Sequence, residues 1–402
     1  MTGLTGRRHS HTPVAILGAG LSGMSAAFHL RRAGLECRIF ERLPKPGGHV
    51  VTVAERGYRF DCTGHLLHVA DESIAALALD WIGPDHQWVD RRSVVWSHGR
   101  TTRYPFQANA YGLPPEVAKA CVMGFIEAQG KDHGPLHDFE QFCLAKFGKG
   151  ISDHFMIPYN TRLWGVAPRE ISADWCQRFV PIPTLEDVVA GAVGVTDREL
   201  GYNTRFLYPT QGIGRLSDGL AAAVGDIELD RSVKRIDTGR QELHFDDERV
   251  SYDVLINTMP LPSFIGICVD ADQEVRSAAS GLRCTHLYYL DVALRTPCRK
   301  PYHWIYVPEA RYPFYRVGCY SHFSAAMAPP GKACLYVELV DRQEPDLKTL
   351  LPEVARGLVE MGLIDHPEAI LFARVRRLDH AFVIFDHAYD ASLAVVKGFL
   401  SR

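Results

Sequence analysis

The sequence lacks the features that define several large classes of protein. It has no uninterrupted apolar run of about 18 residues, so it gives no signal for a transmembrane helix. The polar residues 1–12 lack the apolar core of a signal peptide, which leads us to expect a cytoplasmic protein. A net charge of −3 and a pI near 6.6 give no electrostatic reason to expect binding to nucleic acid or to an anionic membrane.

Residue patterns for metal or hydrolytic chemistry are also missing. The 10 cysteines are scattered, and none forms a C-x-x-C pair or a zinc-ligand spacing. We therefore expect no metal, and cysteines that act as small apolar side chains in a reducing compartment. We find no Ser-His-Asp spacing and no internal repeat. With 402 residues, the chain is long enough for two domains.

What the chain does carry begins with a glycine motif in residues 14–28. An apolar run typical of a buried strand leads into Gly18, Gly20 and Gly23, which form G-x-G-x-x-G, and a helical pattern follows. Gly18 permits a tight turn, Gly20 lets the backbone approach a pyrophosphate, and Gly23 lets the helix pack close to the strand. The motif indicates a dinucleotide site; a purely structural βαβ unit is the alternative.

The start of that helix and a later acidic residue complete the predicted nucleotide site. Leu21 and Ser22 open the helix, whose free N–H groups and positive dipole end would face the phosphates. Glu41 ends a second apolar strand, about 20 residues after Gly20. Its carboxylate would accept hydrogen bonds from the adenosine ribose.

The residues after Glu41 distinguish between dinucleotides. Arg42 is followed by Gly47, Gly48 and His49, and an NAD enzyme has no need of a Gly-Gly turn at this point. The E-x5-G-G pattern resembles the flavoprotein superfamily of amine oxidases, protoporphyrinogen oxidase and UDP-galactopyranose mutase. There the glycine pair lets the backbone run against the flavin and its diphosphate, so the resemblance implies non-covalently bound FAD. An ordinary Pro-Gly loop is the alternative.

Residues 57–65 resemble the superfamily's strand and turn beneath the isoalloxazine ring. The resemblance brings Gly64 and His65 to the flavin. A histidine in that turn, His65 or the nearby His68, could hydrogen-bond near the flavin N5 or move a substrate proton, since its pKa falls near neutrality. The alternative is a histidine that is satisfied by a backbone carbonyl.

A later part of the chain resembles the superfamily's second FAD segment. It comprises residues 209–214, Val233 and residues 252–260. In the superfamily the backbone of the valine meets the adenine. We assign Thr258 and Pro260 to the same cofactor site.

The order of these patterns predicts an α/β fold in which two domains are interleaved along the chain. One is an FAD-binding, Rossmann-like domain of the glutathione-reductase type, and the other is an α+β substrate domain. The FAD domain is expected to comprise residues 1–85, 205–270 and 365–402. The substrate domain is expected to comprise residues 86–204 and 271–364, with residues 114–200 mostly helical.

The middle of the chain resembles the mutase branch of the superfamily. Residues 104–107 (Y-P-F-Q) and 155–165 look like segments that recur there. By this resemblance Tyr159 and Trp164 fall on aromatic positions that grip the substrate, and Arg283 falls on one of two arginines that hold its diphosphate. The alternatives are core aromatics and a surface arginine.

The chain also departs from the mutase pattern. Ile182 stands where the second diphosphate-binding arginine is expected, which puts nucleotide-sugar binding in doubt. Tyr315 and Arg316 could reach the cofactor face, or they could be a pair on the surface of a sheet. The superfamily's usual closing G-R-x-G segment and helix do not appear before Arg402, which leads us to expect weaker FAD retention.

These observations lead to one functional hypothesis and two alternatives. The first is an FAD-dependent oxidoreductase that transfers a hydride to flavin from a polar substrate, sugar-like or an amine. The first alternative is a UDP-galactopyranose mutase-like isomerase that uses reduced FAD without net redox change and takes a nucleotide sugar. The second is a non-catalytic flavoprotein relative. The candidate catalytic residues are His65, Tyr159, Trp164, Arg283, Tyr315 and Arg316.

Overall fold

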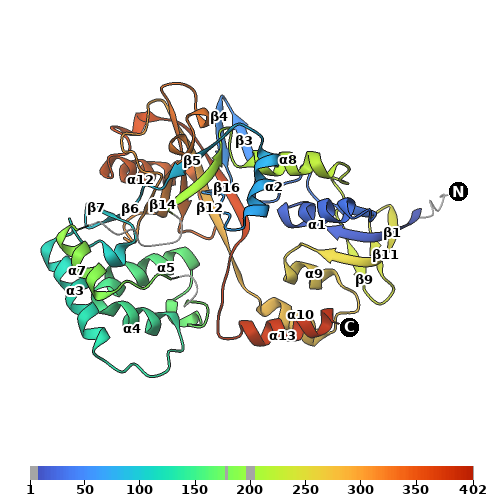
Figure 1. The fold of residues 1–402 in the computed structure, drawn as a ribbon, viewed down its shortest axis with the longest axis horizontal. Coiled ribbons are helices and arrows are strands. Elements are labelled where there is room, and N and C mark those ends of the chain that lie inside the picture. The colour runs from blue at the N-terminus through green and yellow to red at the C-terminus, as the bar shows by residue number, and fades with distance from the viewer. Residues whose placement is uncertain (1–7, 177–179, 196–203, 402) are drawn as a thin grey trace.

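The computed structural model describes residues 8–176, 180–195 and 204–401, which form two lobes (Figure 1). One lobe is built on a five-stranded sheet in the order β2-β1-β11-β10-β9. The other is built on a seven-stranded sheet in the order β16-β12-β15-β14-β13-β6-β7. Within these described ranges, no helix combines the length and the apolar character needed to cross a membrane.

The smaller sheet is buried on both faces. β1 pairs in parallel with β2 on one side and with β11 on the other. Because successive strand residues point to opposite faces, Val14 and Ile16 pack with α1 and α8, whereas Ala15 and Leu17 pack with α9, α10 and α13. The strands are β1 (Arg8–Leu17), β2 (Cys37–Phe40), β9 (Arg235–Asp237), β10 (Glu242–His244) and β11 (Glu248–Asn257). The helices are α1 (Leu21–Arg32), α8 (Gly214–Val224), α9 (Leu261–Ile267), α10 (Gln273–Gly281) and α13 (Tyr389–Leu400).

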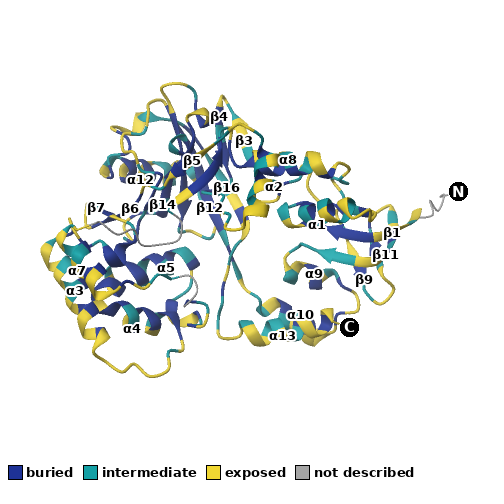
Figure 2. Cartoon of the chain, viewed as in Figure 1, coloured by how far each residue is buried: buried dark blue, intermediate teal, exposed yellow. Residues whose placement is uncertain are grey.

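The larger sheet forms the core of the other lobe. Its central strands β12, β14 and β15 are almost wholly buried (Figure 2). All its pairings are antiparallel except that between β13 and β6, which is parallel. The strands are β6 (Ser93–Ser97), β7 (Arg100–Arg103), β12 (Cys284–Leu294), β13 (Trp304–Tyr306), β14 (Phe314–Cys319), β15 (Ala333–Leu339) and β16 (Ile370–Val383).

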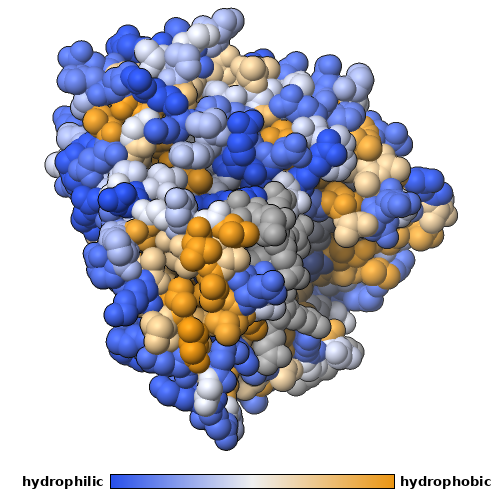
Figure 3. All heavy atoms as spheres, turned by 60° about the vertical axis from the view of Figure 1, so that its left-hand side comes forward, coloured by the Kyte–Doolittle hydropathy of each residue, from blue (hydrophilic) through white to orange (hydrophobic). Residues whose placement is uncertain are grey.

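Helices cover the larger sheet on both faces. The apolar side of α12 (Leu347–Glu360) packs on one face, and a helical group packs on the other. That group comprises α3 (Pro115–Gln129), α4 (Phe139–Ile151), α5 (Ile157–Trp164) and α7 (Leu185–Val193). Figure 3, turned so that the left of Figure 1 comes forward, shows apolar side chains gathered at the surface there, and α7 exposes Leu185, Val189 and Val193.

Short elements join the lobes and bring the flavin-associated motifs to their boundary. The hairpin of β3 and β4 pairs Thr52 with Asp61, and β5 pairs with β8. These elements are β3 (Thr52–Glu55), β4 (Tyr58–Asp61), α2 (Glu72–Ile82), β5 (His86–Asp90) and β8 (Arg205–Pro209).

Two segments lie differently from the predicted division into domains. The helix α10, which we assigned to the substrate domain, packs Val275 and Ala279 into the core of the lobe that holds the glycine motif. The strand β16, which we assigned to the FAD domain, pairs with β12 in the larger sheet. In both segments, packing against residues that are distant in sequence determines which lobe the segment joins.

Candidate functional site

The glycine motif forms a turn that leaves the start of α1 open. Gly18 has a φ of 100°, and a Cβ on Gly23 would lie 2.0 Å from the Gly18 carbonyl oxygen, so neither position accepts a side chain without strain. Gly20 caps α1 with no side-chain hydrogen bond to the first-turn N–H groups. Those donors and the helix dipole therefore form a site suited to a phosphate.

The glycine pair lies directly against this turn. The Gly47 N–H donates to the Ala19 carbonyl at 2.8 Å, and Gly20 and Gly47 form an isolated β-bridge. A Cβ on Gly48 would lie 3.2 Å from the Gly20 Cα. The pair thus brings a second backbone segment alongside the phosphate-binding turn.

Glu41 is fixed at the end of β2 by backbone donors. Its Oε2 accepts from the Ala19 N–H at 2.8 Å, and its Oε1 accepts from the Leu43 N–H at 2.9 Å. The residue is buried, yet it borders a cleft of about 770 Å³. Because each carboxylate oxygen can accept more than one hydrogen bond, Glu41 retains capacity to bind ribose hydroxyls.

The cleft runs from the glycine turn toward the larger sheet, and most of the predicted cofactor residues line it. The predicted residues on its wall are Gly18, Gly20, Leu21, Ser22, Glu41, Arg42, Gly48, His49, Val233, Thr258 and Pro260. Gly23 and Gly47 support the wall from behind, as described above. Gly64 and His65 are not part of the cleft lining. A Cβ on Gly64 would lie 2.3 Å from the Tyr336 hydroxyl oxygen, so the lack of a side chain at Gly64 makes room for the ring of Tyr336.

Buried acidic side chains lie on the wall at the end remote from the glycine turn. Asp61 accepts from the Thr52 hydroxyl at 2.6 Å, from the Tyr208 hydroxyl, and from the Ile213 N–H at 3.1 Å, at the start of α8. Burial raises the pKa of Asp61 to about 6. Asp291 pairs with Arg376 at 2.8 Å, and burial also raises its pKa to about 6. Sequence reasoning missed both residues.

Two histidines line the cleft, and a third interacts electrostatically with one of them. His49 and His380 line it, and His65 lies close enough to His49 for their charges to interact. Burial lowers the pKa of His49, and charges on His65 and His380 lower it further. Burial likewise lowers the pKa of His65, whose Nδ1 hydrogen-bonds to the Cys62 carbonyl oxygen. His49 and His65 are therefore neutral at pH 7, and the Nε2 of His65 is left as an acceptor.

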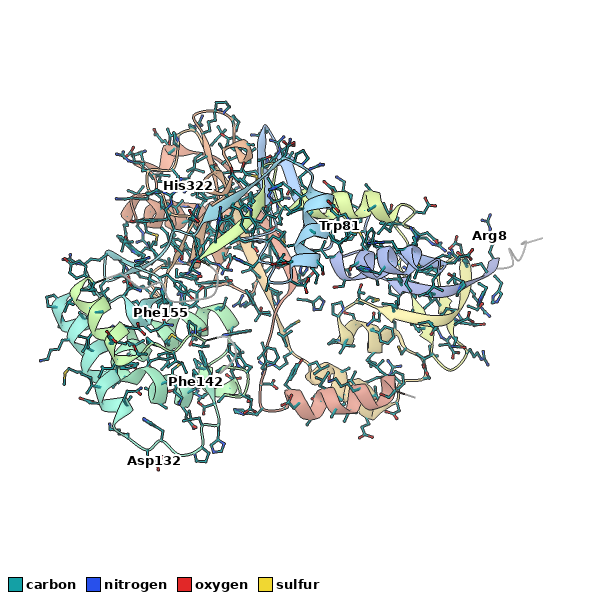
Figure 4. The ribbon with its side chains drawn as sticks, viewed as in Figure 1. Arg8, Trp81, Asp132, Phe142, Phe155 and His322 are labelled. Carbon is teal, nitrogen blue, oxygen red and sulfur yellow. The ribbon has the colours of Figure 1, made fainter. Side chains whose placement is uncertain are left out.

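An aromatic cluster lies near Arg316, whose charge acts on both His65 and Tyr159. We define it as Tyr104, Phe155, Tyr159, Tyr306 and Tyr315. The ring centroids of Tyr104 and Tyr306 lie 4.6 Å apart, those of Tyr159 and Tyr306 lie 5.3 Å apart, and those of Phe155 and Tyr159 lie 5.2 Å apart. Figure 4 labels Phe155 beside α5. The sequence had identified Tyr159 and Tyr315, and both are buried here.

Arg316 pairs with a buried carboxylate beneath this cluster. Its Nε and Nη2 donate to the two carboxylate oxygens of Glu338 at 2.9 and 2.8 Å. Both charges act on His65: Glu338 raises its pKa and Arg316 lowers it. The side chains of Arg316 and Glu338 both lie inside the protein and not on an exposed face of the sheet. Glu338 was not identified as a site residue from the sequence.

Other predicted catalytic residues lie outside the cleft lining. Trp164 is buried against Trp175 and Phe382, at centroid distances of 5.5 and 5.7 Å. Arg283 is 44% exposed and pairs with Asp386 at 3.3 Å, just before β12. Ile182 is exposed. These residues were identified from the sequence, but their surroundings could not be predicted from it, because the surroundings depend on how distant segments pack.

A second cavity, of about 550 Å³, lies beside the aromatic cluster. Arg91, Arg92 and Arg103 line it together with Tyr104 and Asn109. The Arg91 guanidinium lies 5.3 Å from the Tyr104 ring centroid. This basic cavity was not identified from the sequence, although Arg91 and Arg92 are consecutive in the chain.

The turn, the glycine pair, Glu41 and the cleft together define a dinucleotide-binding flavoprotein fold, and comparison with known proteins identifies its family. Residues 21–361 match the family described as flavin-containing amine oxidoreductase, and the chain belongs to it. Its cofactor is FAD, and the family comprises FAD-dependent enzymes that act on small molecules. The prediction of an α/β, FAD-binding fold is thus confirmed, as is the resemblance to this superfamily.

Solved structures show the same fold. The chain is similar to reduced UDP-galactopyranose mutase, with a TM-score of 0.90 and 24% identity, covering 97% of this chain and 88% of that one. It is also similar to an engineered putrescine oxidase, with a TM-score of 0.65 and 14% identity, covering 98% of this chain and 100% of that one.

Curated relatives match over shorter stretches. Polyamine oxidase 3 of Oryza sativa subsp. japonica is 30% identical over 131 residues, which is 31% of this chain and 27% of the relative. A ferredoxin–NADP reductase of Thermus thermophilus is 39% identical over 54 residues, 13% of this chain and 16% of the relative. The chain thus spans about a quarter or less of the length of these relatives.

Proposed function

We propose that this protein is an FAD-dependent oxidoreductase that removes a hydride from a C–N or C–O centre of a polar substrate, either an amine or a sugar-like alcohol. The observation that carries the proposal is that His49 and His380 line the cofactor cleft and that His65 is near enough to His49 for their charges to interact. Bound FAD would supply the hydride acceptor.

The histidines would supply the proton acceptor that this chemistry needs. When an ammonium or hydroxyl substrate is oxidised, its carbon loses a hydride and its nitrogen or oxygen loses a proton. Burial lowers the pKa of His65, so its ring is neutral, and its Nδ1–H is held by the Cys62 carbonyl. The Nε2 of His65 can therefore accept the substrate proton, directly or through His49.

The aromatic cluster would hold the substrate next to these histidines. Burial raises the pKa of Tyr159 and of Tyr315 well above the usual value, so their hydroxyls stay protonated and remain hydrogen-bond donors. Arg316 and Glu338 neutralise each other, which leaves a polar but uncharged surface there. These features support a polar substrate of moderate size.

Anaerobic titration of the FAD-loaded protein with candidate amines and sugar alcohols tests the proposal. A substrate should bleach the oxidised-flavin absorbance in one turnover. The reduction rate should rise with pH through a pKa below 6.5, because the imidazole must be neutral, and His65→Gln should slow it by about 10²–10⁴-fold.

His68→Gln is the matched control for that experiment. Burial also lowers the pKa of His68, but its ring lies 6.1 Å from that of Phe206, and the charge that acts on it is that of Arg91 and not that of a cleft histidine. The control should reduce flavin at the wild-type rate. Equal loss in both variants, or no effect of His65→Gln, would contradict the role given to His65.

A second candidate function is a mutase-like isomerisation of a nucleotide sugar on reduced FAD. The basic cavity lined by Arg91, Arg92 and Arg103 favours it, because guanidinium groups match phosphate oxygens and Tyr104 links this cavity to the aromatic cluster. Incubation of chemically reduced enzyme with UDP-galactopyranose distinguishes the two. Furanose formation without consumption of an oxidant would favour the mutase over the oxidoreductase.

A further inference from the structure

A cluster of potential metal ligands lies in the lobe of the larger sheet, apart from the cofactor cleft. One ligand atom from each of Cys298, Cys319 and His322 lies within 4.8 Å of the other two. Cys298 belongs to the loop between β12 and β13, Cys319 ends β14, and His322 lies in the short helix α11 (Tyr320–Phe323). Figure 4 labels His322 in this lobe. Among the residues that the structure describes, this is the one group of three such ligands.

The separations fit a tetrahedral zinc ion after a small closure. Zn–S bonds of about 2.3 Å and Zn–N bonds of about 2.0 Å place tetrahedral ligand atoms roughly 3.5–3.8 Å apart. The observed atoms all lie within 4.8 Å of one another, so the closure that a zinc ion needs is at most about 1 Å. Cys319 is anchored by its N–H, which donates to the His303 carbonyl at 2.9 Å. The closure would thus fall mainly on the loop that carries Cys298.

The hydrogen bonds of the two nearby histidines leave His322 available as a ligand. The Nδ1 of His322 lies 2.7 Å from the Tyr302 carbonyl oxygen, so it carries the proton and Nε2 keeps a free lone pair. A backbone carbonyl that fixes the tautomer in this way is typical of histidines that bind zinc. His303 is already engaged, because its Nδ1 accepts from the Arg92 N–H at 2.8 Å. Cys298 and His322 are partly exposed, so solvent can fill a fourth position.

We propose that Cys298, Cys319 and His322 bind one Zn²⁺ ion, with water as the fourth ligand. Two thiolates would balance the charge of the ion, and this combination of soft sulfur and imidazole ligands favours zinc over the hard cations Mg²⁺ and Ca²⁺. The ion would fasten the β12–β13 loop to the corner between β14 and α11. The site is independent of the flavin chemistry proposed above, because none of its residues lines the cofactor cleft.

Metal analysis of the purified, FAD-loaded protein tests the proposal. Wild type, reduced and supplied with Zn²⁺, should retain one zinc ion per chain after gel filtration. Cys298→Ser and His322→Gln should each lose the zinc ion while they keep bound FAD and an unchanged far-UV circular dichroism spectrum. Substitution with Co²⁺ should produce thiolate charge-transfer absorption in wild type only.

Cys284→Ser is the matched control. Cys284 is also partly exposed, and its sulfur lies 3.1 Å from the His380 Nδ1, but no third ligand accompanies that pair among the described residues. The control should keep its zinc. Wild type that binds no zinc, a zinc ion that survives both ligand substitutions, or a Cys298–Cys319 disulfide that persists in reducing buffer would overturn the proposal.

Discussion

The ion pair between Arg316 and Glu338 provides a quantitative test of the interior of the site. Glu338 is fully buried, the Arg316 side chain is 22% exposed, and two hydrogen bonds of 2.9 and 2.8 Å join them. Glu338→Gln keeps the shape of the side chain but removes its charge, which leaves the guanidinium unpaired among aromatic rings. Breaking a buried pair in this way costs about 3–5 kcal/mol. The substitution also replaces one of the two acceptor oxygens by an amide NH₂, so one charge-assisted hydrogen bond, at about 1.5–3 kcal/mol, is lost outright and the other becomes weaker.

The assay is equilibrium urea unfolding of the FAD-loaded protein, followed by tryptophan fluorescence. The double variant Arg316→Met/Glu338→Leu removes both charges and should be far closer to wild type than Glu338→Gln, because no charge is left buried. In Glu338→Gln the pKa of His65 should also fall further, since Glu338 raises it and Arg316 lowers it. A loss below about 1 kcal/mol in Glu338→Gln, or a double variant as unstable as the single one, would refute this reasoning.

Further predictions concern the cofactor turn, the buried carboxylate and the exposed arginine. Gly23→Ala should abolish FAD retention, because its Cβ would lie 2.0 Å from the Gly18 carbonyl oxygen. Gly266→Ala is the control, because its Cβ would meet no neighbouring atom within 4 Å, and it should retain FAD. Equal flavin absorbance of the two purified variants would contradict the packing argument. Because burial raises the pKa of Asp61 from 3.8 to about 6, its native state keeps a proton that the unfolded chain has lost, so the free energy of unfolding should fall by about 3 kcal/mol as pH rises from about 4 to about 6. Asp61→Asn should flatten that slope in urea titrations, and an unchanged slope would assign it to other groups. Arg283→Ala should change stability by less than about 1 kcal/mol and leave FAD affinity unchanged by fluorescence titration; a large loss of affinity would place Arg283 in the site after all.

The nucleotide half of the site was predictable because its signal is local. Gly18, Gly20 and Gly23 lie within one turn, and the conformation of that turn alone restricts which residues it accepts. Glu41 and Gly48 follow within one βαβ unit, so their placement needs little more than the right-handed crossover of parallel strands. The cleft lining agrees with most of the residues named from these patterns.

The substrate half depends on contacts that no short pattern records. His49 and His380 meet in the cleft although more than 300 residues separate them, and no spacing rule connects them. The partner of Arg316 lies on the neighbouring strand β15, in a register set by the whole sheet. Similarly, Cys298 meets Cys319 and His322 only because a loop folds back on β14, which is why the sequence indicated no metal site.

The pairing of β1 with β11 also constrains how the chain is made. Hydrogen bonds in this part of the sheet join residues 240 and 241 positions apart. At ribosomal rates of about 5–20 residues per second, β1 emerges on the order of tens of seconds before its central partner exists. During that interval an apolar strand waits with one edge unpaired. The sheet that carries the FAD site is therefore complete only after β11 has been synthesised, and a fragment ending before β11 should fail to bind the cofactor.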